Sequence, residues 1–129
     1  MLKRNIVVAA LTLTSLLAVA GPVAAKDGDV IRRGQCTGAS TWKLKLSPEN
    51  GRISVEFQVD QNRNYRLWNV RLTDNGSLAW RGSRLTQPPS GALNVRRLVT
   101  NRAGADRIVA RAVNARTGEV CRGVATAGF

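Results

Sequence analysis

The chain has 129 residues, with 20 Lys and Arg against 8 Asp and Glu, two Cys, no His and a net charge of +12. This length indicates one domain, and the lack of His excludes Ser-His-Asp or Cys-His catalysis and any imidazole metal site. The positive charge favours anionic partners but carries no information about the fold.

Residues 1–25 are typical of a secretory signal peptide. Lys3 and Arg4 form a positive N-terminal region, and residues 6–20 are uncharged and mostly apolar. A Gly-Pro pair then ends the apolar stretch, and small residues precede the expected cleavage site. Because the stretch is shorter than the about 20 residues of a membrane-spanning helix, we expect cleavage rather than an anchor. The prediction is a secreted, extracellular protein with no transmembrane anchor after cleavage, whose mature domain is 26–129.

Export makes the two cysteines interpretable, because an oxidising compartment favours disulfides. Cys36 and Cys121 allow only one pairing, which would tie the start of the domain to its last predicted strand. A redox pair or a metal site is a poorer interpretation, since the sequence has no CxxC motif and two thiolates do not complete a zinc site. We therefore predict a structural disulfide, no metal and no cofactor.

The dominant hydrophobic period of the mature chain is two, which predicts β-strands. The alternation is clearest over residues 53–59, where every second residue is Ile, Val or Phe. It recurs over three further segments: 42–46, 68–72 and 108–113. Weaker patterns predict additional strands at 30–36, 78–85, 92–99 and 120–126.

Turn-forming residues separate these segments. Asn-Gly pairs within 47–51 and 74–76 predict tight hairpin turns, and residues 115–118 predict another. Residues 61–64 are a polar connector, and 87–91 is a Pro- and Gly-containing loop. Seven or eight short strands with turns at these intervals predict one all-β domain, an antiparallel β-sandwich.

The apolar phase of each strand predicts the core. Its expected members are Trp42, Leu44, Leu46, Ile53, Val55, Phe57, Val59, Trp68, Val70, Leu72 and Trp80. The three Trp could instead form a platform on which a ligand stacks. Trp42 and Trp68 are in phase with aliphatic neighbours, which favours the core. Gly82 and Ser83 make the strand of Trp80 irregular, so Trp80 is the Trp we expect to be exposed if one is.

Several runs of the mature chain carry a resemblance. They are Cys36, STWKLKL at 40–46, RISVEF at 52–57, WNVRL at 68–72, residues 93–99 and NRAGADR at 101–107. Together they resemble a group of small secreted proteins common in high-GC Gram-positive bacteria. The resemblance implies an exported, disulfide-bearing domain and brings no established activity, ligand or site residues. The order of strands and turns is also similar to immunoglobulin-like and fibronectin type III sandwiches, a likeness of fold that carries no function.

Basic residues on the predicted strands are the candidate binding feature. If several converge on one sheet face, they would attract a polyanion such as teichoic acid, extracellular nucleic acid or an acidic polysaccharide. The alternative is a solvated surface that keeps the protein soluble, and no run has the pattern of a specific nucleic-acid motif. The predicted polyanion-binding residues are Lys43, Lys45, Arg66, Arg71, Arg96 and Arg97, and further basic positions are Arg81, Arg84, Arg102, Arg107, Arg111, Arg116 and Arg122.

Carboxylates are the residues left for acid–base catalysis. A glycosidase needs two of them about 5–10 Å apart, whereas Glu56 and Asp60 would lie about 13 Å apart along one strand. We expect Asp74 and Asp106 to be turn residues or partners of Arg, with Asp106 hydrogen-bonded to nearby backbone after a tight turn. The Asp-Gly-Asp sequence at 27–29 lacks the later Glu of a calcium loop.

The sequence therefore predicts a non-catalytic binding or interaction module of the extracellular or cell-wall space. Its partner would be a protein or a cell-wall component, contacted through a sheet face or the end loops. The alternative is a basic polyanion binder, and a carboxylate-dependent hydrolase is more remote. Salt distinguishes the first two, because binding to a polyanion weakens steeply as salt rises.

Overall fold

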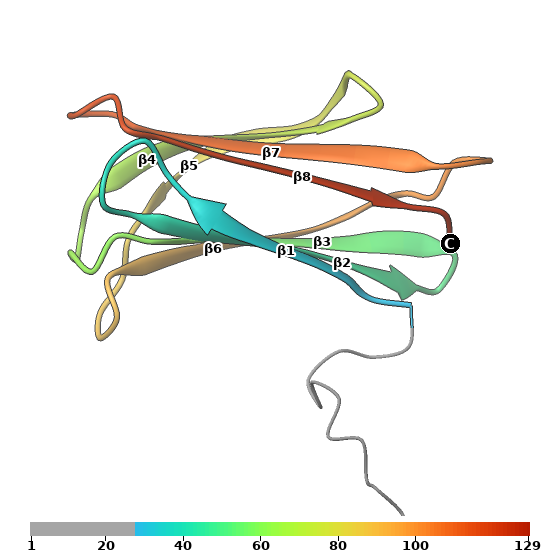
Figure 1. Ribbon diagram of the computed structural model, residues 1–129, viewed down its shortest axis with the longest axis horizontal. Coiled ribbons are helices and arrows are strands. Elements are labelled where there is room, and N and C mark those ends of the chain that lie inside the picture. The colour runs from blue at the N-terminus through green and yellow to red at the C-terminus, as the bar shows by residue number, and fades with distance from the viewer. Residues whose placement is uncertain (1–27) are drawn as a thin grey trace, which may run out of the picture.

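The computed structural model describes residues 28–129, and the signal peptide predicted for residues 1–25 lies outside them. The described chain forms two antiparallel four-stranded sheets that pack face to face as a β-sandwich (Figure 1). The first sheet has the order β1-β2-β3-β6 and the second the order β5-β4-β7-β8. The strands are β1 Val30–Gln35, β2 Thr41–Glu49, β3 Arg52–Asp60, β4 Leu67–Asp74, β5 Ser77–Leu85, β6 Ala92–Thr100, β7 Asp106–Asn114 and β8 Val120–Ala127. The predicted sandwich and each predicted strand are confirmed.

Two Asn-Gly pairs set the tightest hairpins. Asn50 and Gly51 have φ of 49° and 76°, and Asn75 and Gly76 have φ of 48° and 85°. Positive φ at both central residues is what a two-residue turn needs to match the twist of its strands, and Asn and Gly tolerate it best. The first turn is shorter than predicted, because β2 continues to Glu49. Pro48 fits there because β1 does not extend far enough to pair beside it.

The core lies between the inner faces of the two sheets. The predicted aliphatic core residues, Phe57 and Trp68 are all buried, and the core also contains Leu93, Val95, Ile108 and several small residues of β7 and β8. Trp68 is fully buried, and its indole Nε1 donates a hydrogen bond to Gln61 Oε1 at 2.9 Å. Burial of these apolar side chains is the main force that holds the sheets together.

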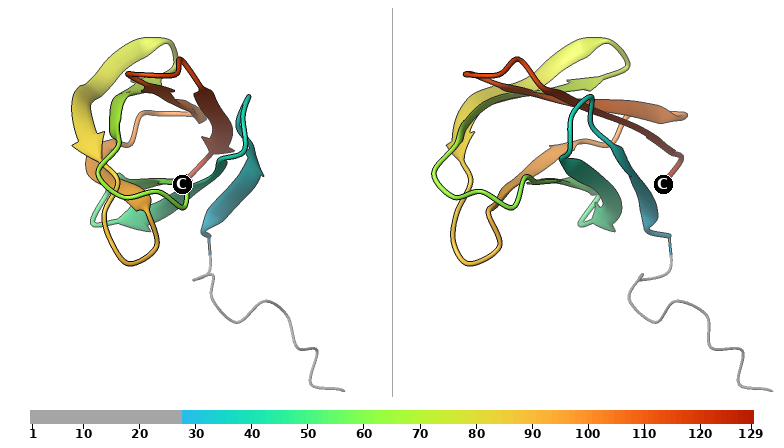
Figure 2. Two further views of the ribbon diagram at one scale, coloured as in Figure 1. Left: turned by 90° about the vertical axis from the view of Figure 1, so that its left-hand side faces the viewer. Right: turned by 60° about the vertical axis from the view of Figure 1, so that its left-hand side comes forward.

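The other two Trp occupy the seams where the sheets meet. Trp42 is partly buried and lies against Gly34 and Gly123, where an added Cβ would come within 2.6 Å of the indole. Trp80 is partly buried where β5 approaches β6, so it belongs to the rim of the core. Figure 2 shows how the curved sheets approach each other along these seams. Both residues contribute to packing, as predicted, but neither is fully buried.

A disulfide and the C-terminus join the sheets on the β1–β8 side. Cys36 and Cys121 are bonded as predicted, with an S–S distance of 2.04 Å, and connect the end of β1 to β8. Phe129 packs against the core, and its carbonyl oxygen accepts a hydrogen bond from Asn101. The two sheets are therefore linked covalently at one end and packed at the other.

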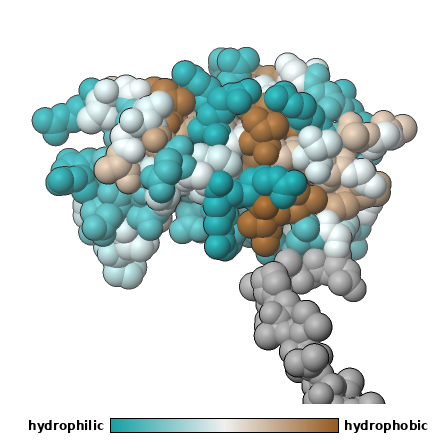
Figure 3. All heavy atoms as spheres, viewed as in Figure 1, coloured by the Kyte–Doolittle hydropathy of each residue, from teal (hydrophilic) through white to brown (hydrophobic). Residues whose placement is uncertain are grey.

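Within residues 28–129, no helix has the length and apolar character needed to cross a membrane. Figure 3 shows hydrophilic side chains over most of this face of the molecule, with smaller apolar patches among them. Most charged residues of the described chain are exposed, whereas Asp74 and Asp106 are buried.

Candidate functional site

The outer face of the second sheet carries one Arg on each of its strands. In β4, Val70 and Leu72 point into the core and are buried, so Arg71 between them points outward. In β7, Ala110 and Ala112 are buried in the same way on either side of Arg111. The equivalent outward residues of β5 and β8 are Arg81 and Arg122, and all four are exposed.

Strand register brings these four residues into one line. Arg71 is directly opposite Arg81 on β5 and Arg111 on β7, and Arg111 is directly opposite Arg122 on β8. Neighbouring strands are about 4.8 Å apart, so the line crosses the sheet over about 14 Å. We call Arg81, Arg71, Arg111 and Arg122 the arginine row.

The arginine row lacks acidic partners among residues 28–129. None of the ion pairs in the described residues includes a member of the row. Like charges directly opposite each other destabilise a sheet, so the row lowers stability rather than raising it. Planar guanidinium groups bind phosphate and carboxylate in a bidentate manner. The arrangement is therefore suited to an anion with several charged groups.

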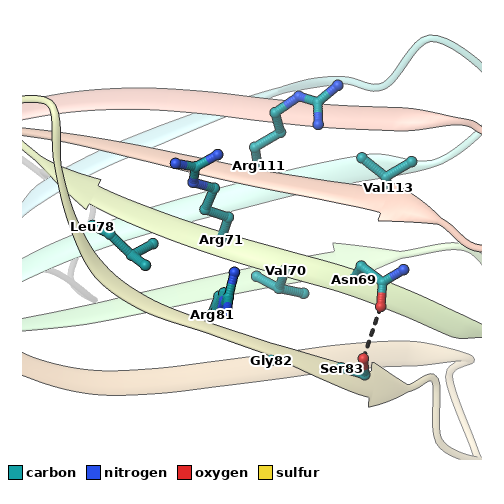
Figure 4. Close-up of a pocket in the computed structure, with 9 residues that line it drawn as sticks. All are labelled: Asn69, Val70, Arg71, Leu78, Arg81, Gly82, Ser83, Arg111 and Val113. Atoms are coloured by element: carbon teal, nitrogen blue, oxygen red, sulfur yellow. Dashed lines mark hydrogen bonds between the residues drawn. The ribbon is translucent and has the colours of Figure 1, made fainter.

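A shallow groove of about 530 Å³ is lined by three of the four members of the row, Arg81, Arg71 and Arg111. Figure 4 shows Arg71 and Arg111 side by side on neighbouring strands, with Arg81 below them. Leu78 is 49% exposed at the edge of the groove. At its other side, Ser83 Oγ donates a hydrogen bond of 2.7 Å to Asn69 Oδ1 (Figure 4). The groove thus combines guanidinium groups with a small apolar surface and neutral polar groups.

Two of the predicted polyanion-binding residues lie on the opposite face of the molecule and are paired with carboxylates. Lys45 Nζ is 3.6 Å from Asp29 Oδ2 and 3.8 Å from Glu56 Oε2. Arg96 Nη2 is 2.9 Å from Glu49 Oε2, and its Nε is 3.9 Å from Glu56 Oε1. The first sheet therefore balances these two charges itself.

The remaining predicted residues are dispersed. Arg71 belongs to the arginine row, and Lys43 lies on the first sheet opposite Gln58. Arg66 precedes β4 and lines a hollow at one end of the sandwich. The guanidinium of Arg97 lies 5.2 Å from the centre of the Trp80 ring, and that of Arg84 lies 4.9 Å from it. The structure thus does not bring the six predicted residues into one site.

Three members of the row, Arg81, Arg111 and Arg122, were only general basic positions in the sequence. The alternation of each strand does indicate that these residues point outward, because an Arg between two buried small or aliphatic residues must lie on the opposite face. The alternation within one strand does not show which strand lies beside it or in which register. The convergence of the four residues was therefore not predictable from a single strand.

The carboxyl groups of Asp74 and Asp106 form a buried pair where β4 ends and β7 begins. The pKa of Asp74 is raised to about 6, chiefly by burial and also by the hydrogen bond and negative charge of Asp106, while Arg102 opposes the rise. Arg102 Nε is 3.7 Å from Asp74 Oδ2, and its backbone N–H donates to Asp106 Oδ2. The expected roles as an Arg partner and as a backbone acceptor are both confirmed.

The other carboxylates considered for catalysis are separated. Glu56 lies between Lys45 and Arg96 on the outer face of the first sheet. Asp60 ends β3, where its Oδ1 accepts the backbone N–H of Asn62. No group of three or more Cys, Asp or Glu within residues 28–129 is arranged to hold a metal ion.

Comparison with known proteins returns no match, either to a protein-family model or to a curated protein.

Proposed function

We propose that this protein is a secreted, non-catalytic binding module whose ligand is an anionic polymer held on the outer face of the second sheet. The observation that carries the proposal is the arginine row, four guanidinium groups in register that no acidic side chain of the described residues neutralises. A line of like charges lowers the stability of the sheet. Bound phosphate or carboxylate groups would remove that repulsion and release counterions.

The length of the arginine row indicates the kind of anion that fits it. A ligand that contacts all four members must present negative groups along about 14 Å, so a chain fits better than a small anion. The two possible sources outside a cell are phosphate-linked chains, such as teichoic acid or nucleic acid, and uronic acid polysaccharides. Guanidinium recognises both kinds of group.

The test is binding of the oxidised protein, exported from cells carrying the full-length sequence, to inorganic polyphosphate and to a polyuronate. Affinity is measured from low salt to above physiological salt. Four contacts predict a slope of about −3 for the logarithm of the binding constant against that of the salt concentration. The double variant Arg71→Gln/Arg111→Gln should lose about half of that slope.

A matched control changes the same number of charges on the first sheet. The variant Arg33→Gln/Arg52→Gln removes two exposed residues far from the row, and its slope should equal that of the unmodified protein. Equal losses in both double variants would show that only net charge attracts the polymer and would overturn the proposal. Preference for polyphosphate or polyuronate identifies which class of chain is the ligand.

A further inference from the structure

A second basic hollow opens at one end of the sandwich. It has a volume of about 540 Å³ and is lined by the loop before β4 and the loop after β7. Three exposed Arg surround it, Arg63, Arg66 and Arg116, and none forms an ion pair within the described residues. We call this feature the tyrosine pocket, because Tyr65 lies between the first two arginines.

Buried hydrogen bonds fix the loop that carries Tyr65. The Tyr65 N–H donates to the Thr86 carbonyl at 2.7 Å, and the Arg66 N–H donates to Thr86 Oγ1 at 2.9 Å. Thr86 itself is fully buried. Gly91 packs against the same loop so closely that an added Cβ would lie 2.3 Å from the backbone nitrogen of Arg63. The pocket is therefore preorganised.

Tyr65 is an unusual residue for its backbone position. Its φ is +57°, in the left-handed region, where Gly or Asn is less strained than a bulky residue. Its side chain is 63% exposed, so the ring contributes little to the core. Strain of this kind persists at functional sites. Because the fold does not need the ring, a role in contact with a ligand explains why an aromatic residue is present.

The tyrosine pocket continues the face that holds the arginine row. Leu67 lines the pocket and shares the outward phase of β4 with Asn69 and Arg71. Arg71 is four positions further along β4 than Leu67, a distance of about 13 Å. A chain bound to the row can therefore reach the pocket by running along β4.

We propose that the tyrosine pocket binds a nucleotide unit of single-stranded nucleic acid, with the base stacked on Tyr65 and the phosphates held by the surrounding arginines. This inference rests on the proposed function, because the arginine row would hold the adjacent phosphates. Proteins that bind single strands combine a basic groove for the backbone with aromatic rings for the bases. An acidic polysaccharide offers no planar base to stack, so the exposed ring favours the nucleic acid.

The test compares a ligand with bases to one without. The probes are a fluorescent oligothymidylate of twelve nucleotides and inorganic polyphosphate, at one salt concentration. Tyr65→Asn suits the left-handed backbone and should fold. It should weaken oligonucleotide binding by about 5- to 100-fold, the range for loss of one stacked base, and change polyphosphate binding less than twofold. Tyr65→Phe keeps the ring and should bind as the unmodified protein does.

A matched control is Leu98→Thr, which removes an exposed apolar side chain from the first sheet and should alter neither affinity. Equal effects of Tyr65→Asn on both probes, or no effect on the oligonucleotide, would overturn the stacking role. Failure of the proposed function is recognised separately, because the unmodified protein would then not bind polyphosphate through the arginine row.

Discussion

The outer faces of the two sheets have the same architecture and differ in how their charges are paired. Across the first sheet, the register places Ile31, Lys45, Glu56 and Arg96 in one line, so a carboxylate separates the two cations. Across the second sheet, the equivalent line consists of four Arg. On the first face acidic side chains pair with the cations between strands, whereas on the second face no ion pair of the described residues involves the four Arg.

This difference shows that net charge alone is a poor guide to a binding surface. Lys45 and Arg96 are basic and solvent-accessible, yet acidic neighbours compensate them. The basic residues behind the net charge of +12 therefore do not all present an unpaired positive charge to a partner. What matters for an anionic polymer is the set of cations that lie in register without carboxylates between them.

The largest expected change in stability comes from removing the disulfide that links the two sheets. Replacing Cys36 and Cys121 by Ser removes a crosslink with a sequence separation of 85. This should lower the free energy of unfolding by about 4–5 kcal/mol, since the unfolded chain regains the entropy of a long loop. Urea unfolding of the oxidised protein and the double variant measures the change. A loss below about 1 kcal/mol would mean that core packing alone holds the sheets together.

The buried pair of Asp74 and Asp106 gives a smaller, pH-dependent effect. The pKa of Asp74 is raised from 3.8 to about 6 by burial, Asp106 and their hydrogen bond, so the native state holds this proton more tightly than the unfolded state. Its contribution to stability is therefore largest below about pH 4, falls as pH rises to about 6 and is constant above. The free energy of unfolding should fall by about 3 kcal/mol over this range, since each unit of pKa difference corresponds to about 1.4 kcal/mol.

Urea unfolding between pH 4 and 7 tests this assignment when Asp74→Asn is compared with the unmodified protein. The neutral amide cannot ionise, so this part of the pH dependence should disappear in the variant. If both proteins show the same profile, Asp74 is not the group responsible. Asp74 and Asp106 belong to β4 and β7 of the second sheet, but both are buried. They therefore do not pair with the arginine row on the outer face.

The smallest expected change in stability comes from exchanging the charge patterns of the two outer faces. This exchange tests the difference between the faces most directly. Arg71→Glu places a carboxylate between Arg81 and Arg111 and should stabilise the protein by about 0.5–1 kcal/mol at low salt. It changes the charge of the row by two, so the salt slope of polyanion binding should fall by about half. The mirror change, Glu56→Arg on the first sheet, should destabilise by a similar amount. Thermal unfolding at two salt concentrations measures both, and high salt should reduce both effects. Destabilisation by Arg71→Glu at low salt would contradict an uncompensated row.

Local patterns were enough to predict much of the fold. The alternation of residues 53–59 predicted a strand with one buried face, and the Asn-Gly pairs predicted the hairpins. These signals are local because each depends on neighbours within a few residues. Only two cysteines are present, so their pairing followed without knowledge of the topology.

The candidate site was less predictable, because it depends on contacts between distant segments. Arg97 is in phase with buried Val95 and Val99, yet it lies at a seam where its guanidinium reaches Trp80. Tyr65 lies outside the alternating segments, so no sequence pattern singled it out. Its left-handed backbone and its proximity to Arg116 on another loop are visible only in the structure.

Local patterns were sufficient to predict the all-β class, the strands, the hairpin turns, the disulfide and, for most strand positions, which side chains point away from the core. The tertiary structure decided which outward residues became neighbours. The physical reason is that period-two alternation is a property of one strand, whereas register is a property of two strands packed over a common core. Arg71 and Arg111 became neighbours only when β4 paired with β7.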